Sequence, residues 1–157
     1  MGDSHQTLKN ARDIFLKILG AQRAQQPPPQ ARDLCYTYNK LRYTCQQLSQ
    51  LNYDASDRMA MIDRAAEYGK HAVQCAVDSR NVHREAQMRF YHACVSAQRI
   101  QLKAEEQCLQ VPTELERENA RRALEEAWVT LQSIQDLDGR PYERMNARSL
   151  SQLLIRS

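Results

Sequence analysis

Cysteine is the residue type whose spacing first suggests chemistry. Cys35 and Cys45 are separated by nine residues, and Cys94 and Cys108 are separated by thirteen. Helical hairpins with twin C-x9-C motifs repeat one spacing so that two disulfides join antiparallel helices. The two spacings here differ by about 6 Å on a helix, which disulfide geometry does not accommodate. Two interpretations stay open, a disulfide-stapled hairpin and buried thiols that pack as small apolar groups, and the odd total of five cysteines favours the second.

Histidines and paired carboxylates add little to this chemistry. No two histidines are four residues apart, and the sequence contains neither H-E-x-x-H nor C-x-x-C. The glutamate pairs at 105–106 and 125–126 lie in runs of mixed charge, which are typical of solvated helix faces. With only four glycines, the chain has no phosphate-binding loop. We therefore expect no metal ligands, no catalytic residues and no enzymatic activity. The four histidines, His5, His71, His83 and His92, are expected to be surface or half-buried side chains.

Tyrosines gather near cations in the stretch 36–53. They are Tyr36, Tyr38, Tyr43 and Tyr53, beside Lys40 and Arg42. Aromatic rings among basic side chains can stack on nucleic-acid bases, but more often they lie at a boundary between helices or proteins. The net charge of +3 is too small to favour nucleic acid, so protein partners are expected.

The composition predicts an all-α chain. Glycine is scarce, and the helix-favouring Ala, Leu, Gln, Glu and Arg are abundant, whereas Val, Ile and Thr are sparse. A hydrophobic content of 42% with a mean hydropathy of −0.72 is typical of long helices with narrow apolar stripes. No run approaches the roughly 18 apolar residues of a membrane span. At 157 residues, the chain suits one domain, or one domain with an extended arm.

Apolar residues at spacings of three and four predict the helices. We expect the first four helices at 7–24, 31–51, from 57 to a weak point at 77–83, and at 83–109, with a last helix from 113 to a stop at 139–141. Asp54 or Ser56 is a natural N-cap for the third helix, and Thr113 with Glu116 forms a capping box for the last.

These helices divide into three expected parts. Residues 1–80 form a three-helix module, 81–139 a long helical hairpin or arm, and 140–157 a tail with the apolar cluster SLSQLLIRS. The apolar stripe of the arm is narrow, so we expect it to pack on other chains.

The opening stretch ARDIFLKILGAQRAQ, residues 11–25, is basic and amphipathic and is followed by three prolines. A transit peptide would be rich in Arg and Ser. Regular helical spacing and a firm proline stop favour a retained first helix instead.

Three groups of residues in the first three predicted helices carry a further pattern. The first is Ile14-Phe15-Leu16, followed by the basic KILGAQR; the second is the pair Leu41-Arg42 before Cys45. The third is a ladder of aliphatic and small residues: Ile62, Ala65, Ala66, Gly69 and Val73. Over residues 8–78 this arrangement resembles the LYR-motif proteins, which are small mitochondrial three-helix modules. Leu16 stands where that family has arginine, and Cys45 stands where it has phenylalanine.

The resemblance implies a non-enzymatic accessory subunit or assembly factor of a mitochondrial complex in the matrix, of the respiratory complex I or iron–sulfur assembly type. Such proteins dock an acyl carrier protein, whose acyl chain on 4′-phosphopantetheine enters between the helices; no cofactor is bound directly. The carrier would contact Lys17, Lys40 and Arg42, and the acyl channel would be lined by Phe15, Leu41, Ala65, Ala66 and Gly69. The alternative is a helical scaffold subunit of a large assembly, such as a mitochondrial ribosome, without a carrier.

Overall fold

The computed structural model describes residues 2–51, 54–105 and 112–134. These residues form five helices and no strand, which confirms the all-α prediction. The helices are α1 (Gly2–Ala24), α2 (Ala31–Leu51), α3 (Ala55–Asp78), α4 (Val82–Glu105) and α5 (Glu114–Ile134). None of the described helices is long and apolar enough to cross a membrane.

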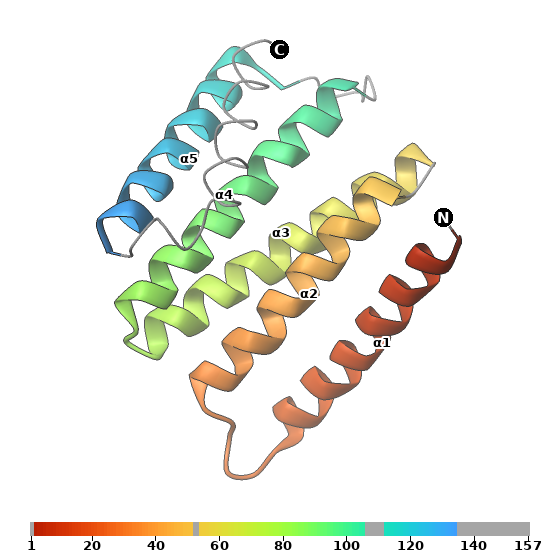
Figure 1. Ribbon diagram of the computed structural model, residues 1–157, viewed down its shortest axis with the longest axis vertical. Coiled ribbons are helices and arrows are strands. Elements are labelled where there is room, and N and C mark those ends of the chain that lie inside the picture. Colours follow the sequence, from red (N-terminus) through yellow and green to blue (C-terminus); the bar gives the residue numbers. More distant parts are fainter. Residues whose placement is uncertain (1, 52–53, 106–111, 135–157) are drawn as a thin grey trace.

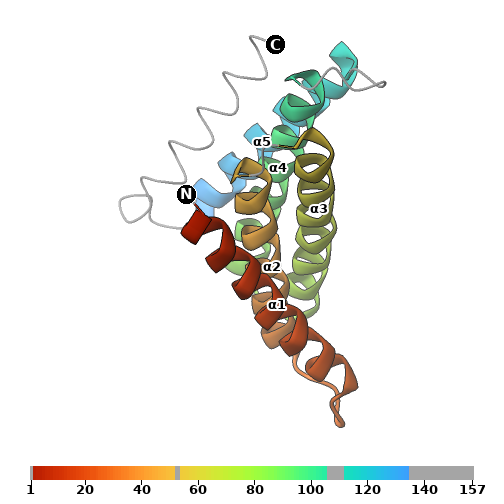
Figure 2. The same ribbon diagram turned by 90° about the vertical axis from the view of Figure 1, so that its right-hand side faces the viewer.

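The five helices form an open array in which each helix packs mainly on its neighbour in the chain. The principal contacts are α1 with α2, α2 with α3, α3 with α4, and α4 with α5. Figure 1 shows the array with α1 at one end and α5 at the other, and Figure 2 looks along it from the α1 end.

The hairpin of α4 and α5 continues this array. We expected residues 81–139 to form a hairpin or an arm that packs on other chains. Within the described residues they form the hairpin, but it does not project as an extended arm, because α4 packs along α3. The expected helix end near 109, the stop at 139–141 and the tail at 140–157 lie outside the described residues.

The helix boundaries follow from local side-chain chemistry. Three prolines lie between α1 and α2, where they cannot continue a helix. Asp54 is the N-cap of α3, since its carboxylate accepts hydrogen bonds from the backbone of Ser56 and Asp57 at 2.8 and 3.2 Å. At the start of α5, the hydroxyl of Thr113 accepts from the backbone of Glu116 at 3.1 Å, which confirms this half of the predicted capping box.

The interior is divided into three clusters, and α4 contributes to all of them. One joins α4 to α5, a second joins α1, α2, α3 and α4, and a third joins α2, α3 and α4. The largest buried members of the first cluster are Phe90, Leu124 and Leu131. Those of the second are Leu19, Tyr38, Leu41 and Met88, and those of the third are Ile62, Cys45 and Val95. Helix α4 therefore joins α5 to the first three helices.

The first helix buries a narrower stripe than its apolar spacing predicts. Leu8, Ala11, Phe15, Ile18 and Gln22 recur at spacings of three and four, and Ile14 and Leu19 widen the predicted stripe. Leu19 is 5% exposed and the other members are half-buried, but Ile18 is 40% exposed and Ile14 is 56% exposed. Because α1 is an end helix that packs mainly on α2, it buries only one narrow stripe. The exposed residues form an apolar flank along its outer side.

The described cysteines are free thiols, and three of them are buried. Burial raises the pKa of the Cys35 thiol and raises that of Cys45 to about 11. The thiol of Cys35 also donates a hydrogen bond to the carbonyl of Ala72, at 3.5 Å. The described thiols therefore match the interpretation as small apolar groups; Cys108 lies outside the described residues.

We expect iodoacetamide at neutral pH to leave Cys35, Cys45 and Cys94 unmodified in the folded chain. Their burial denies access, and a protonated thiol is a poor nucleophile. Peptide mapping by mass spectrometry before and after unfolding in guanidinium chloride measures the extent of modification at each cysteine. Rapid modification of any of the three in the folded chain would contradict this assignment.

Candidate functional site

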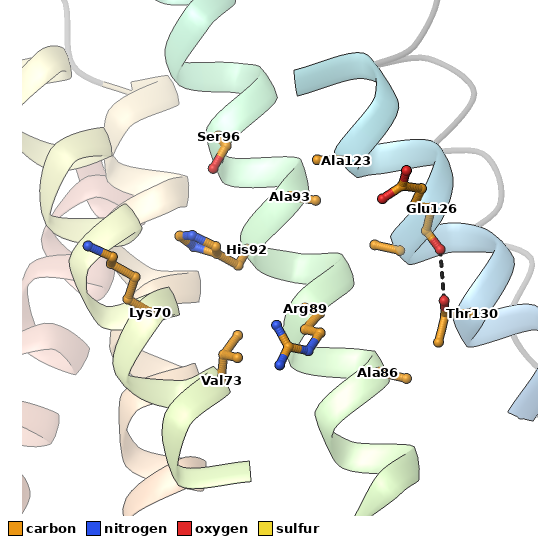
Figure 3. Close-up of a pocket in the computed structure, with 11 residues that line it drawn as sticks. Lys70, Val73, Ala86, Arg89, His92, Ala93, Ser96, Ala123, Glu126 and Thr130 are labelled. Carbon is orange, nitrogen blue, oxygen red and sulfur yellow. Dashed lines mark hydrogen bonds between the residues drawn. The ribbon is translucent and has the colours of Figure 1, made fainter. Parts of the chain in front are cut away.

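A hollow in the described surface lies on α4, between α3 and α5 (Figure 3). It has a volume of about 580 Å³. Its lining from α3 is Lys70 and Val73; from α4 it is Ala86, Arg89, His92, Ala93 and Ser96; from α5 it is Ala123, Glu126, Ala127 and Thr130.

A second hollow of about 460 Å³ adjoins the first along the α3 side of α4. It is lined by Asp63, Ala66, Glu67, Lys70, His92, Ser96, Arg99, Ile100 and Lys103. Lys70, His92 and Ser96 belong to both hollows. We call the two together the α4 groove.

Small side chains create the first hollow. Ala86 and Ala93 of α4 lie one above the other, seven residues apart, and Ala123 and Ala127 of α5 are four residues apart. A longer side chain at any of these positions would fill the space between α4 and α5. The first hollow is therefore a consequence of alanine at these four positions.

Close contact between α3 and α4 sets the middle of the groove. A methyl group added at Gly69 would lie 2.8 Å from Nδ1 of His92, so only glycine lets the imidazole pack against α3 in this way. Nδ1 itself is buried and has no hydrogen-bond partner among the residues that the structure describes. Burial, together with the positive charge of Lys70, lowers the pKa of His92, so the ring is neutral at neutral pH.

Charges along the rim of the groove are partly paired. Nε of Arg99 lies 2.6 Å from a carboxylate oxygen of Asp63, and Nε of Arg89 lies 3.2 Å from one of Glu85. Lys70 makes no ion pair with the described residues, and it is exposed. The shared centre of the groove therefore presents an ammonium group, an imidazole and a hydroxyl.

The three cations predicted to dock a carrier have different environments. Lys17 is exposed on α1, and Lys40 is half-buried on α2 with its ammonium 5.3 Å from the centre of the Tyr36 ring. Arg42 is only 7% exposed, because its guanidinium lies 4.6 Å from the centre of the Tyr91 ring of α4.

Arg42 belongs to a polar network inside the array. Its guanidinium donates to Asn39 at 2.7 Å and to Gln46 at 2.6 Å, and the Gln46 amide donates to Gln98 of α4, also at 2.6 Å. This network joins α2 to α4, so Arg42 faces the interior while Lys17 faces solvent.

The residues predicted to line an acyl channel are divided among the core and the groove. Phe15 packs beside the cluster that contains Leu41, and Ala65 is fully buried in another cluster. Ala66 lines the second hollow, and Gly69 contacts His92. Ala66 and Gly69 thus lie on the side of α3 that faces the α4 groove.

The groove residues Lys70, Ser96 and Ala123 were not singled out from the sequence, and His92 was expected only to be a surface or half-buried side chain. His92 is indeed half-buried. The alanine pairs on α4 and α5 were the one available signal, since small residues at helical spacing mark a face where packing is thin. The spacing of these alanines does not predict that α3 forms the third wall of the hollow.

No group of three metal-binding side chains occurs within the residues that the structure describes. Comparisons of the chain with protein-family models, with curated proteins and with solved structures found no match.

Proposed function

We propose that this chain is a non-enzymatic helical subunit that binds other proteins within a larger assembly. The observation that carries the proposal is the open array, which leaves a groove along α4 and an apolar flank on α1 uncovered in the described chain. Helices stacked on their chain neighbours present extended surfaces of the kind that bind protein segments.

Exposed aliphatic and aromatic side chains on α1 and α2 fit this role. Ile14 and Ile18 of α1 are 56% and 40% exposed, and Tyr36 and Tyr43 of α2 are 53% and 48% exposed. Aromatic and aliphatic side chains are enriched at the centres of protein interfaces. A partner that covers these side chains would remove them from water.

The more specific form of the proposal follows the resemblance to LYR-motif proteins. In that form the chain is an accessory subunit or assembly factor of a mitochondrial complex and holds an acyl carrier protein. The exposed Lys17, flanked by the exposed Leu16 and Ile18, supports it, because a cation beside apolar groups suits an acidic carrier surface. Arg42 would have to leave its buried network to take part.

Native mass spectrometry of the affinity-purified chain tests both levels of the proposal. We expect a stoichiometric complex, and for the carrier form a subunit whose mass includes 4′-phosphopantetheine and an acyl chain. Lys17→Glu should release the carrier, because it places a negative charge against an acidic surface. Lys70→Glu makes the same change on α3 instead of α1, and this variant should retain the carrier.

Each outcome has a definite meaning. A stoichiometric complex without a carrier would favour the scaffold subunit, as would equal carrier retention in the two variants. A stable, monodisperse monomer with no partner from its native source would overturn the proposal that the chain is a subunit.

A further inference from the structure

We propose that the α4 groove binds an extended peptide segment of a partner protein through an acidic side chain, which Lys70 and Ser96 hold at the centre of the groove. This inference rests on the proposed role as a protein-binding subunit and adds the chemistry of one ligand. It concerns a surface of α3, α4 and α5, whereas Lys17 lies on α1.

The charges of the groove select an acidic ligand at its centre. Asp63, the carboxylate on the α3 rim, is neutralised by Arg99 at 2.6 Å, whereas Lys70 has no ion-pair partner among the described residues. All three side chains shared by the two hollows, at positions 70, 92 and 96, can donate hydrogen bonds.

The lining carboxylates other than Asp63 limit where an acidic side chain of the ligand can lie in the groove. Glu67 lines the second hollow from α3, three residues before Lys70, and Glu126 lies on the α5 wall of the first. Figure 3 shows Lys70 and Glu126 on opposite sides of α4. An acidic side chain that pairs with Lys70 therefore lies on the α3 side of α4, away from Glu126, and its pairing with Lys70 must outweigh repulsion from Glu67.

The shape of the groove suits an extended chain with a small apolar residue next to its acid. From Ala86 to Lys103 the groove follows about 26 Å of helix, the length of about eight residues of extended peptide. The alanine floor at 86, 93, 123 and 127 offers an apolar seat of limited depth. His92 lies beside the middle of this floor, because the absence of a side chain at Gly69 lets its ring pack against α3.

Panning a phage-displayed library of random linear peptides against the full chain tests the proposal. We expect the selected peptides to share an Asp or Glu beside a small apolar residue. Lys70→Glu should weaken binding of synthetic copies of these peptides by about tenfold or more at low salt, because like charges then face each other. Changing the acid of the peptide to lysine should restore binding to the Lys70→Glu variant.

Two further variants separate the groove from general effects. Lys17→Glu carries the same charge change on α1 and should bind the peptides as the unmodified chain does. Ala123→Phe fills the first hollow from an exposed position on α5, and should abolish binding while far-UV circular dichroism stays unchanged.

The proposal is overturned if no peptide is enriched, if the enriched peptides lack an acid, or if Lys70→Glu and Lys17→Glu bind alike. These results are independent of the native complex. A chain that keeps its stoichiometric partner but shows no acidic peptide preference would retain the proposed function and lose this inference. A chain that selects acidic peptides but purifies as a monomer would retain this inference and lose the proposed function.

Discussion

Replacing Phe90 with alanine is expected to lower the free energy of unfolding by about 3–5 kcal/mol. The Phe90 side chain is fully buried, and its ring centre lies 5.4 Å from that of Trp128 on α5 and 6.0 Å from that of Tyr91. It is the largest buried side chain in the cluster that joins α4 to α5. The neighbouring core residues are mostly alanine, so they cannot collapse into the cavity.

Urea unfolding followed by circular dichroism measures this loss, and hydrogen exchange locates it. Exchange should accelerate most in α5, because that helix packs chiefly on α4. Leu115→Ala removes a large apolar side chain from α5 at a position that is 69% exposed, and should change stability by less than about 0.5 kcal/mol. Equal losses in the two variants would show that Phe90 is not buried as described.

Replacing Gly69 with leucine is expected to destabilise the chain by about 1–3 kcal/mol, and alanine at His92 should relieve much of that loss. The first added carbon would lie 2.8 Å from Nδ1 of His92 and 3.5 Å from Cγ of Arg42. Leucine is a better helix former than glycine, so any destabilisation comes from the forced separation of α3 and α4.

A double-mutant cycle measures this coupling. Gly69→Leu should cost at least about 1 kcal/mol less in the His92→Ala background than in the unmodified chain, since the smaller side chain leaves room for the leucine. Additive effects would contradict the contact. This contact also means that Gly69→Leu disturbs the core, so loss of a carrier in that variant would not by itself reveal an acyl channel, and Lys17→Glu is the cleaner test.

Much of the fold was predictable because it depends on patterns within single helices. The bounds of α2 agree with the spacing analysis at both ends, and the caps at Asp54 and Thr113 are as expected. Burial of Phe90, Ala93 and Ala97 follows from their spacing of three and four. These features need only the chain geometry of one helix and its adjacent turn.

The groove was less predictable because it depends on how three helices meet. The small residues around Gly69 indicated a close neighbour, but not that the neighbour is His92, some twenty residues further along the chain. Arg42 illustrates the same difficulty. An arginine beside tyrosines suggests an exposed docking residue, yet packing of Tyr91 from α4 encloses it.

Packing between chain neighbours has a kinetic and mechanical consequence. Native contacts that join segments close in sequence form early and quickly, so the array should fold fast for its size. The same topology lets a helix at the end of the array detach while the central helices stay folded. Among the described residues, α5 packs chiefly on α4. A ligand bound in the groove contacts both α4 and α5. Binding of this ligand would therefore slow the detachment of α5 from α4.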